Sequence, residues 1–252
     1  MNLNQTLHMI VLEENIKLVE EIIKDVSVVV MFRKTFKHIK QEYVLPELKR
    51  KNLDGRRVYR DNDGNQYESV TNVVGFKDKE ALQQWRDKVG EDVANHISGK
   101  AMQLGTKMHN TIELYLNNEP LIENNIFANA HFNNIQSLVD KIDNIIGVEQ
   151  RLCSKTLGLA GTADCLADYN GIKSIIDFKT SGKQKKEEWI DKYFMQTTAY
   201  SLMWEELTGE SLQQIVVLIS GEDGSLDEFI RDRDDYVESL HEVINLYKQG
   251  GV

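Results

Sequence analysis

The sequence predicts an α/β fold in which a mixed central sheet is flanked by helices and preceded by a mainly helical arm. Apolar residues recur at helical spacing through most of residues 1–146. Between residues 148 and 180 the pattern changes to short apolar strands separated by turns, and beyond residue 187 helix and strand patterns alternate. We therefore expect an arm at 1–146 and a core at 147–252, joined into one integrated domain.

Helical periodicity dominates the arm. Aliphatic residues predict a helix over Ile10–Val26, and apolar side chains that step by four predict another over Ala81–Ile97. A third helical stretch follows Gly99 and carries its apolar side as far as Leu116. A further helix is expected from Phe132 to Ile146, because its aliphatic residues are again three or four apart.

One hairpin interrupts these helices. It is expected at Val58–Tyr67, where an Asn-Asp-Gly-Asn turn separates two tyrosine-containing segments. Ser69 and Thr71 follow directly and are candidate helix caps or strand-end residues.

The core begins with three strands separated by short turns. The expected elements, in order, are strands at Val148–Lys155, Leu159–Tyr169 and Ile172–Thr180, a helix at Glu187–Leu207, a strand at Gln214–Ser220 and a helix at Asp234–Tyr247. The order of elements is thus a helical arm, three strands, a helix, a strand and a helix, which is typical of a mixed sheet covered by helices.

The charge is unevenly distributed along the chain. A formal net charge of −10 argues against a general nucleic-acid binder. Acidic residues dominate from Glu205 to Glu242, and a basic stretch occupies Arg33–Arg60. The bases in that stretch are Arg33, Lys34, Lys37, Lys40, Lys49, Arg50, Lys51, Arg56, Arg57 and Arg60. Such a stretch can bind phosphates locally or be only a solvated helix face, and both interpretations stay open.

Several classes of protein are excluded by composition. Two cysteines, Cys153 and Cys165, cannot form a four-thiolate zinc or iron–sulphur site, and we expect both to be reduced thiols in core strands. No apolar run approaches the roughly 20 residues that span a bilayer. Acidic residues among the first 30 argue against a secretory signal or a transit peptide. We therefore expect a cytoplasmic protein with no membrane partner.

The most informative segment is a predicted hairpin around Asn170-Gly171, a dipeptide that favours a two-residue turn because both positions tolerate positive φ. If the residues on either side of this dipeptide pair, Asp164 lies directly opposite Asp177. Directly opposed side chains have Cβ atoms roughly 4.5–5.5 Å apart. Lys179 lies two residues beyond Asp177 and so on the same face of its strand.

Two carboxylates at that distance repel each other unless a shared proton or a divalent cation neutralises them. Oxygen-rich sites of this kind suit Mg²⁺ or Mn²⁺. A lysine beside a carboxylate pair at a metal is typical of phosphodiester hydrolysis. The alternative is a structural Asp–Lys ion pair on a solvated strand, but the second aspartate, inside otherwise apolar strands, favours the metal.

Three more residues are candidates for the same site. Gln196 and Tyr200 are four apart and share one helical face, where they could hold a phosphate or the lysine. His109 shares a face with Ile112 and Leu116. A lone histidine on an apolar face is more often a core residue than a ligand, so the helical pattern alone does not assign it.

Together these residues resemble the PD-(D/E)xK nucleases of the RecB-like branch, and most closely the mitochondrial genome maintenance exonuclease group and its relatives in tailed bacteriophages. The matching motifs, in the family's order and spacing, are Gly105-Thr106-x-x-His109, Gly161-Thr162-Ala163-Asp164, Asp177-Phe178-Lys179-Thr180 and Gln196-x-x-x-Tyr200. Tyr67-Glu68-Ser69-Val70-Thr71, followed by Trp85, looks like that group's Tyr-Pro-Ser-Val-Thr element. The likeness covers roughly residues 58–200.

The resemblance implies a restriction-endonuclease-like core and a role for each motif residue. The implied metal ligands are His109, Asp164, Asp177 and the main-chain carbonyl of Phe178. Lys179 would be the catalytic lysine, with Gln196 and Tyr200 positioning lysine, water or phosphate. Expected substrate contacts are Thr180, Lys183, Ser69 and Thr71. Glu149 stands where many relatives carry an acid, with no role assigned.

Three departures from the family pattern refine this expectation. Glu68 replaces the proline of the Ser-Val-Thr element. The iron–sulphur branch is excluded because its four cysteines are missing, and without a transit peptide a bacterial or phage-infected cytoplasm fits better than a mitochondrion.

The expected function is a Mg²⁺- or Mn²⁺-dependent exonuclease that hydrolyses single-stranded DNA, or DNA with single-stranded ends, in replication, recombination or repair. One alternative is a structure-specific endonuclease for flaps or junctions. The other is a non-catalytic DNA-binding recombination protein, and a replication or recombination protein is a conceivable partner.

Further DNA contacts are expected from charged and aromatic side chains. The charged candidates are Lys183, Lys185, Lys186 and the basic Arg33–Arg60 stretch, and the aromatic ones that could stack on bases are Trp85, Tyr67 and Tyr115. The family resemblance also implies that the helical arm before Gln150 helps guide single-stranded DNA to the site.

Overall fold

The computed structural model describes residues 34–53, 55–121 and 126–250. The chain divides into two units, 1–35 and 36–252, and the account below concerns the second. The helix predicted at Ile10–Val26, and Arg33 of the basic stretch, lie outside the described residues. Within the described part of the chain, no helix combines the length and the apolar character needed to cross a membrane.

The described strands form one mixed sheet of eight strands. They are β1 (Lys49–Leu53), β2 (Arg56–Arg60), β3 (Gln66–Ser69), β4 (Ile142–Ser154), β5 (Leu159–Tyr169), β6 (Ile172–Ser181), β7 (Gln214–Gly221) and β8 (Leu226–Asp232). The order is β1-β2-β3-β5-β6-β7-β8, with β4 paired to β5 outside this path. Pairs β3–β5 and β6–β7 are parallel, and the other neighbours are antiparallel.

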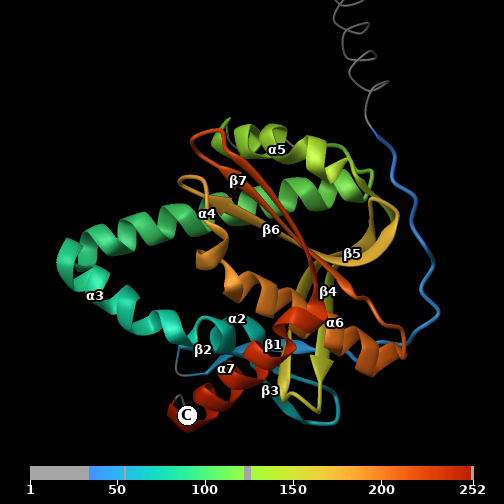
Figure 1. Ribbon diagram of the computed structural model, residues 1–252, viewed down its shortest axis with the longest axis horizontal. Coiled ribbons are helices and arrows are strands. Elements are labelled where there is room, and N and C mark those ends of the chain that lie inside the picture. The colour runs from blue at the N-terminus through green and yellow to red at the C-terminus, as the bar shows by residue number, and fades with distance from the viewer. Residues whose placement is uncertain (1–33, 54, 122–125, 251–252) are drawn as a thin grey trace, which may run out of the picture. The chain divides into compact units, whose positions relative to one another are not determined.

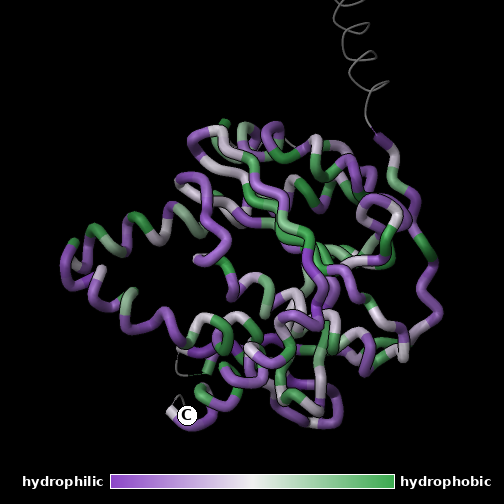
Figure 2. Tube along the Cα trace, viewed as in Figure 1, coloured by the Kyte–Doolittle hydropathy of each residue, from purple (hydrophilic) through white to green (hydrophobic). Residues whose placement is uncertain are grey.

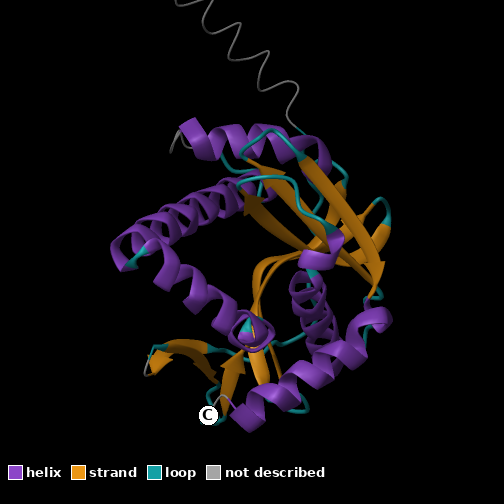
Figure 3. Ribbon diagram, turned by 60° about the vertical axis from the view of Figure 1, so that its left-hand side comes forward, coloured by secondary structure: helices purple, strands orange, loops and turns teal. Residues whose placement is uncertain are grey.

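Helices cover both faces of this sheet, as the sequence predicts (Figures 1 and 3). They are α2 (Val70–Val74), α3 (Lys79–Val89), α4 (Glu91–Leu116), α5 (Ile126–Val139), α6 (Asp191–Thr208) and α7 (Val237–Gly250), with short 3₁₀ turns at Phe76–Asp78, Glu187–Trp189 and Arg233–Tyr236. One apolar cluster lies between the sheet and α2, α6 and α7, and a second lies between the sheet and α4 and α5.

Strand alternation explains the two clusters. In β6, Ile175 packs toward the α6 side while Ile176 and Phe178 pack toward α4 and α5. In β7, Val217 and Leu218 divide in the same way. Strands buried on both faces read as unbroken apolar runs, and Figure 2 shows such a run through the middle of the sheet.

The sheet forks along one edge of β5. On that edge, β3 pairs with Leu159 and Ala160, whereas β6 pairs from Cys165 to Tyr169. Strand β4 holds the opposite edge along almost the whole length of β5. Among the described residues, no strand pairs with the forked edge between Gly161 and Asp164. Thr162 and Asp164 in this stretch can therefore contact side chains from other elements.

Two helix boundaries differ from the sequence prediction. The helix expected over Ala81–Ile97 is broken at Gly90, where φ is +86° and the backbone leaves the helical region. The break expected at Gly99 is absent, because α4 runs straight through that residue. The apolar residues step by four on both sides of Gly90, so the pattern gives no sign of the break there. At Gly99 the long helix tolerates the glycine.

The helix predicted from Phe132 to Ile146 is wrong in its last part. Helix α5 ends at Val139, and Ile142 already pairs with Tyr169 in the sheet. Ile145 and Ile146 pack into different core clusters, which is strand behaviour. Short apolar runs fit both periods, and pairing with β5 decides between them here. The expected division at 146/147 consequently falls inside β4.

Two edge strands had no counterpart in the prediction. Strands β1 and β2 both come from the basic stretch, and the interpretation of that stretch as a solvated helix face is wrong for these residues. Strand β8 pairs with β7, and it contains many charged residues, as a surface loop would. The two cysteines are free thiols buried in β4 and β5, as expected.

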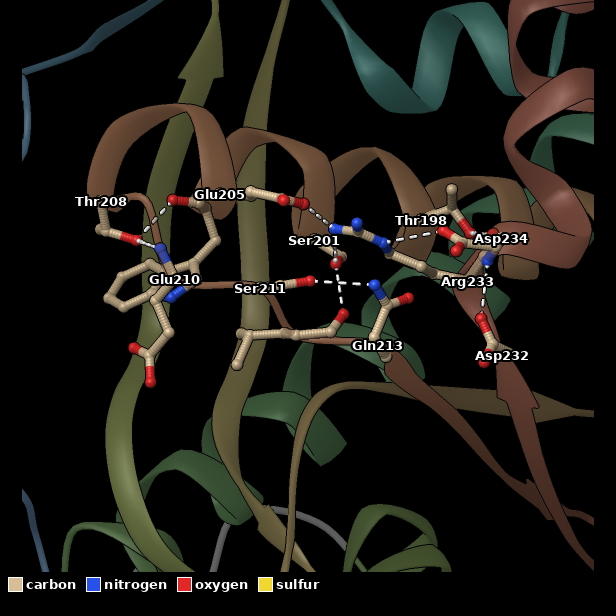
Figure 4. A network of polar contacts seen from close by, with 12 residues as sticks. Thr198, Ser201, Glu205, Thr208, Glu210, Ser211, Gln213, Asp232, Arg233 and Asp234 are labelled. Carbon is tan, nitrogen blue, oxygen red and sulfur yellow. Dashed lines mark hydrogen bonds and ion pairs between the residues drawn. The ribbon is translucent and has the colours of Figure 1, made fainter.

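A buried arginine ties α6 to the segment after β8 (Figure 4). Arg233 is 6% exposed, pairs with Glu205 of α6, and donates to Ser201 Oγ at 3.2 Å. Its Nε also lies 3.2 Å from Asp234. Part of the acidic C-terminal region thus serves the fold, because Glu205 neutralises a charge that burial would otherwise leave uncompensated. This anchor holds in place the helix that carries Gln196 and Tyr200.

Candidate active site

The predicted register of the Asn-Gly hairpin is confirmed from Tyr169–Ile172 to Cys165–Ile176. Asn170 and Gly171 have φ of 52° and 81°, as the tight turn requires. The pairing of β5 with β6 ends one residue pair before Asp164 and Asp177, at the point where the sheet forks. There the Phe178 N–H donates to Asp164 Oδ2 at 2.9 Å, so the carboxylate itself joins the two strands.

Asp177 lies beneath the site and is 1% exposed. Its Oδ2 forms an ion pair with Lys179, and its Oδ1 accepts a hydrogen bond of 2.8 Å from Gln196 Nε2. Burial raises the pKa of Asp177 to about 6, although the Lys179 charge opposes that shift and the nearby Asp164 adds to it. Gln196, from α6, therefore holds a carboxylate whose ionisation depends on its neighbours.

Lys179 keeps its charge despite burial. Desolvation lowers the pKa of its ammonium, but Asp177 and Asp164 outweigh that effect and raise it above the ordinary value. The Nζ atom also lies 5.2 Å from the ring centroid of Tyr193. A protonated lysine thus lies at the bottom of the site, where its positive charge favours the binding of an anion.

Three residues bring potential metal ligands together beside this pair: His109 of α4, Glu149 of β4 and Asp164 of β5. The His109 Nδ1 lies 3.6 Å from Asp164 Oδ2 and 3.9 Å from Glu149 Oε1. One ligand atom from each residue lies within 4.8 Å of the other two. Glu149 has a φ of 50°, a backbone conformation that costs energy in a residue with a side chain.

The histidine is fixed from its other side. Its Nε2 lies 2.8 Å from the Phe178 carbonyl oxygen, so this nitrogen donates and Nδ1 faces the carboxylates. Burial lowers the pKa of His109, but Asp164 and Glu149 outweigh it and raise the value to about 9. A cation entering among these groups would replace the proton that now balances the two acids.

These groups open into a cavity of about 640 Å³. Its lining residues are Arg50, Arg57, Tyr59, Ser69, Thr71, Val74, Gly75, Gly105, Thr106, His109, Asn110, Glu113, Glu149, Thr162, Asp164, Lys179, Lys192, Tyr193, Gln196 and Tyr200. Residues from β1, β2, β3, α2, α4, β4, β5, β6 and α6 thus meet at this cavity.

The remaining expected substrate contacts divide into two groups. Ser69 and Thr71 line the cavity, and their hydroxyls are 2.9 Å apart. Thr180 and Lys183 are not among the lining residues; the Thr180 hydroxyl instead faces Gly105 of α4, where a Cβ would lie 3.6 Å away. That distance is an ordinary van der Waals contact, so the helix carrying His109 packs beside β6 at this point.

Two aromatic residues expected to stack on bases are buried instead. Tyr67 and Tyr115 are only 2% and 1% exposed, and their hydroxyls bond to Asp61 and Asp140. The expectation is wrong for both, since a ring without an exposed face cannot stack on a base. A tyrosine that the sequence pattern did not single out, Tyr193, lines the cavity in their place.

Glu149 was the least defined of the acidic candidates in the sequence. Strand pairs Val148–Cys165 and Gln150–Ala163 place it level with Asp164 in the adjacent strand. The position of Glu149 beside Asp164 would follow from the pairing register of β4 and β5. That register could not be predicted, because the turn at 155–158 lacks a dipeptide that favours one turn type.

Replacing Gly161 with alanine is expected to displace Tyr200 and destabilise the protein by about 1–3 kcal/mol. An added Cβ would lie 2.7 Å from both the Tyr200 hydroxyl and a ring carbon, and the ring is buried. Thermal unfolding should show the loss. A Gly161→Ala/Tyr200→Leu double variant should lose less than the sum of the single changes. As a control, Gly99→Ala, with open space around it, should be neutral or stabilising; strict additivity of the pair would contradict the close approach.

Comparison with known proteins shows a partial sequence likeness. No family profile matches the chain. Mitochondrial genome maintenance exonuclease 1 of Homo sapiens is 24% identical over 156 residues, which cover 57% of this chain and 45% of that protein. The Mus musculus protein of the same name is 26% identical over 113 residues, covering 41% and 32%. The matched regions thus span less than half the length of these relatives.

A structural comparison finds a crystal structure of a candidate exonuclease from Eubacterium rectale. The two chains superpose with a TM-score of 0.43 and 14% sequence identity, over 59% of this chain and 65% of the other.

Proposed function

We propose that this chain is a divalent-metal-dependent exonuclease that hydrolyses phosphodiester bonds of single-stranded DNA. The observation that carries the proposal is that Lys179, which is paired with the buried Asp177, lines one cavity together with the group formed by His109, Glu149 and Asp164. The sequence likeness to two exonucleases supports a nuclease. Its assignment to the RecB-like PD-(D/E)xK branch is part of the proposal.

The donor set fits a Mg²⁺ or Mn²⁺ ion. His109, Glu149 and Asp164 offer one nitrogen and two carboxylate oxygens, and together they would hold the ion. Asp177 and the Phe178 carbonyl remain proposed ligands, although here they contact Lys179, Gln196 and His109. When bound, the ion supplies Lewis acidity that polarises a phosphate and eases the ionisation of water.

The chain's own residues then act on the phosphate from the other side. The Lys179 ammonium donates hydrogen bonds toward a phosphate oxygen or the attacking water, where negative charge grows. Asp177 holds that ammonium in position, and Gln196 holds Asp177. Because Asp177 and Gln196 are buried and Lys179 is only partly exposed, water competes weakly for these hydrogen bonds.

Digestion of end-labelled single strands, with matched circular single strands, tests the proposal. We expect cleavage of linear strands in Mg²⁺ or Mn²⁺, none in EDTA, and intact circles. Cleavage that persists in EDTA would contradict the metal-dependent mechanism. Cut circles would favour the structure-specific endonuclease, and binding without turnover in Mn²⁺ would favour the non-catalytic protein.

A further inference from the structure

Two arginines line the active-site cavity from a hairpin that contributes nothing to the metal group. Arg50 of β1 pairs with Tyr59 of β2, and Arg57 lies two residues before Tyr59. Strand alternation therefore puts both arginines and Tyr59 on one face of the hairpin. All three residues line the cavity, so this face is turned toward it.

Neither guanidinium is neutralised by another residue that the structure describes. Among the described residues, no carboxylate lies within 4.0 Å of Arg50 or Arg57, and neither side chain has a hydrogen-bond acceptor. Lys192, another cation in the lining, is paired with Asp78. Arginine presents planar N–H donors that match phosphate oxygens, so two free arginines at a cavity wall suit an anion.

Hydroxyl groups stand next to this wall. The β2–β3 register pairs Val58 with Glu68, and one further step brings Arg57 level with Ser69. The Ser69 hydroxyl lies 2.9 Å from that of Thr71, and both line the cavity. Two hydroxyls beside two guanidinium groups make a donor-rich surface, as expected for phosphate contacts.

The cavity is electrically polarised. Glu113, Glu149 and Asp164 are its acidic lining residues, whereas the hairpin wall carries two free positive charges. The acidic residues come from α4, β4 and β5, and the two arginines come from β1 and β2, so opposite charges line the cavity from different elements.

We propose that Arg50 and Arg57, with the Ser69 and Thr71 hydroxyls, form an anion subsite for a backbone phosphate flanking the one that is cut. The subsite rests on the proposed function and adds to it how the strand is held. Because phosphates carry no base identity, this contact is independent of sequence. It also requires a substrate longer than a single nucleotide.

Binding without a metal tests the subsite separately from cleavage. The probe is a fluorescent single-stranded oligonucleotide in EDTA, and its anisotropy is measured over a series of salt concentrations. Arg50→Ala/Arg57→Ala should weaken binding at low salt by about tenfold or more. The slope of log affinity against log salt should fall by about 1.4, since each contact to a single strand contributes about 0.7.

A matched control removes the same charge from the opposite face of the hairpin. Lys49 and Lys51 alternate with Arg50 in β1, so they lie on the opposite face and do not line the cavity. The proposal therefore limits the DNA contacts expected of the basic stretch in this hairpin to its two cavity-lining arginines. Lys49→Ala/Lys51→Ala should leave the affinity within about twofold and change the slope little. Equal losses in both double variants, or no loss in either, would overturn the subsite.

Two more measurements complete the design. An oligonucleotide of abasic sites should show the same loss in the arginine variant, and a loss that depends on bases would overturn a phosphate contact. If the wild-type protein binds through these arginines but never cleaves in Mn²⁺, the proposed function fails while the subsite stands. If it cleaves and the arginine variant binds normally, only the subsite fails.

Discussion

Lys179→Met should lower the rate of single-strand cleavage by about 10²–10³-fold or more, because it removes the ammonium that is paired with Asp177 and that we propose stabilises charge on the phosphate. The methionine nearly keeps the volume of the lysine stem. Single-turnover digestion of an end-labelled strand in saturating Mn²⁺ measures the rate of the chemical step. Lys173→Met is a matched control, since Lys173 lies at the other end of β6 with an exposed Glu210 pair, and it should change the rate less than about threefold.

The same substitution should also destabilise the fold, so the two effects must be separated. Removing one partner of a buried ion pair costs about 3–5 kcal/mol, because the other charge is left without compensation. An Asp177→Asn/Lys179→Met double variant removes both charges and should regain much of the lost stability, as thermal unfolding would show. Its cleavage should remain lost. If activity returned together with stability, the lysine would be only a structural partner of Asp177.

Asp164→Asn should abolish binding of the divalent ion and, with it, cleavage. Asp164 contributes an oxygen to the three-residue group, so its loss should weaken Mn²⁺ binding by more than the 10–100-fold that removal of an outer partner costs. The asparagine Oδ1 can still accept the Phe178 N–H, which preserves the junction of β5 and β6. Calorimetric titration with Mn²⁺ in the absence of DNA measures the affinity directly.

Thermal unfolding provides an independent control for this variant. A ligand at 100 times its dissociation constant stabilises the folded state by about 2.7 kcal/mol. The wild-type protein should therefore unfold at a higher temperature with Mn²⁺ than with EDTA, and Asp164→Asn should not. Asp168→Asn, at the far end of the same strand, should respond as the wild type does. An undiminished Mn²⁺ response in Asp164→Asn would place the ion elsewhere.

The hairpin that carries the two aspartates was predictable because its geometry is local. Asn170 and Gly171 adopt positive φ, and the pairing of the next residues then follows from strand periodicity. The placement of Lys179 on the same face as Asp177 needs only alternation. Likewise, the composition of β6 and β7 shows that both are buried on two faces, which requires helices above and below.

Elements without a local signal were mistaken or missed. Ile142 and Ile146 fit a helical period and a strand period equally, and their contacts with β5 and the core assign them to β4. Strand β1 contains mostly basic residues, and its own sequence does not indicate a strand. Pairing with β2 stabilises it. In both cases partners outside the segment overrode the local pattern.

The sequence by itself therefore determined the acid pair, its lysine, and a mixed sheet covered by helices, since each depends on residues a few positions apart. Only the tertiary structure placed Glu149 level with Asp164, opened the fork in β5, and turned Arg50 and Arg57 toward the cavity. Those arrangements depend on pairing between segments far apart in the chain, such as β3 with β5, where no turn sets the register. Long-range pairing is decided by burial and hydrogen bonding over the whole sheet, and no short stretch of sequence contains that information.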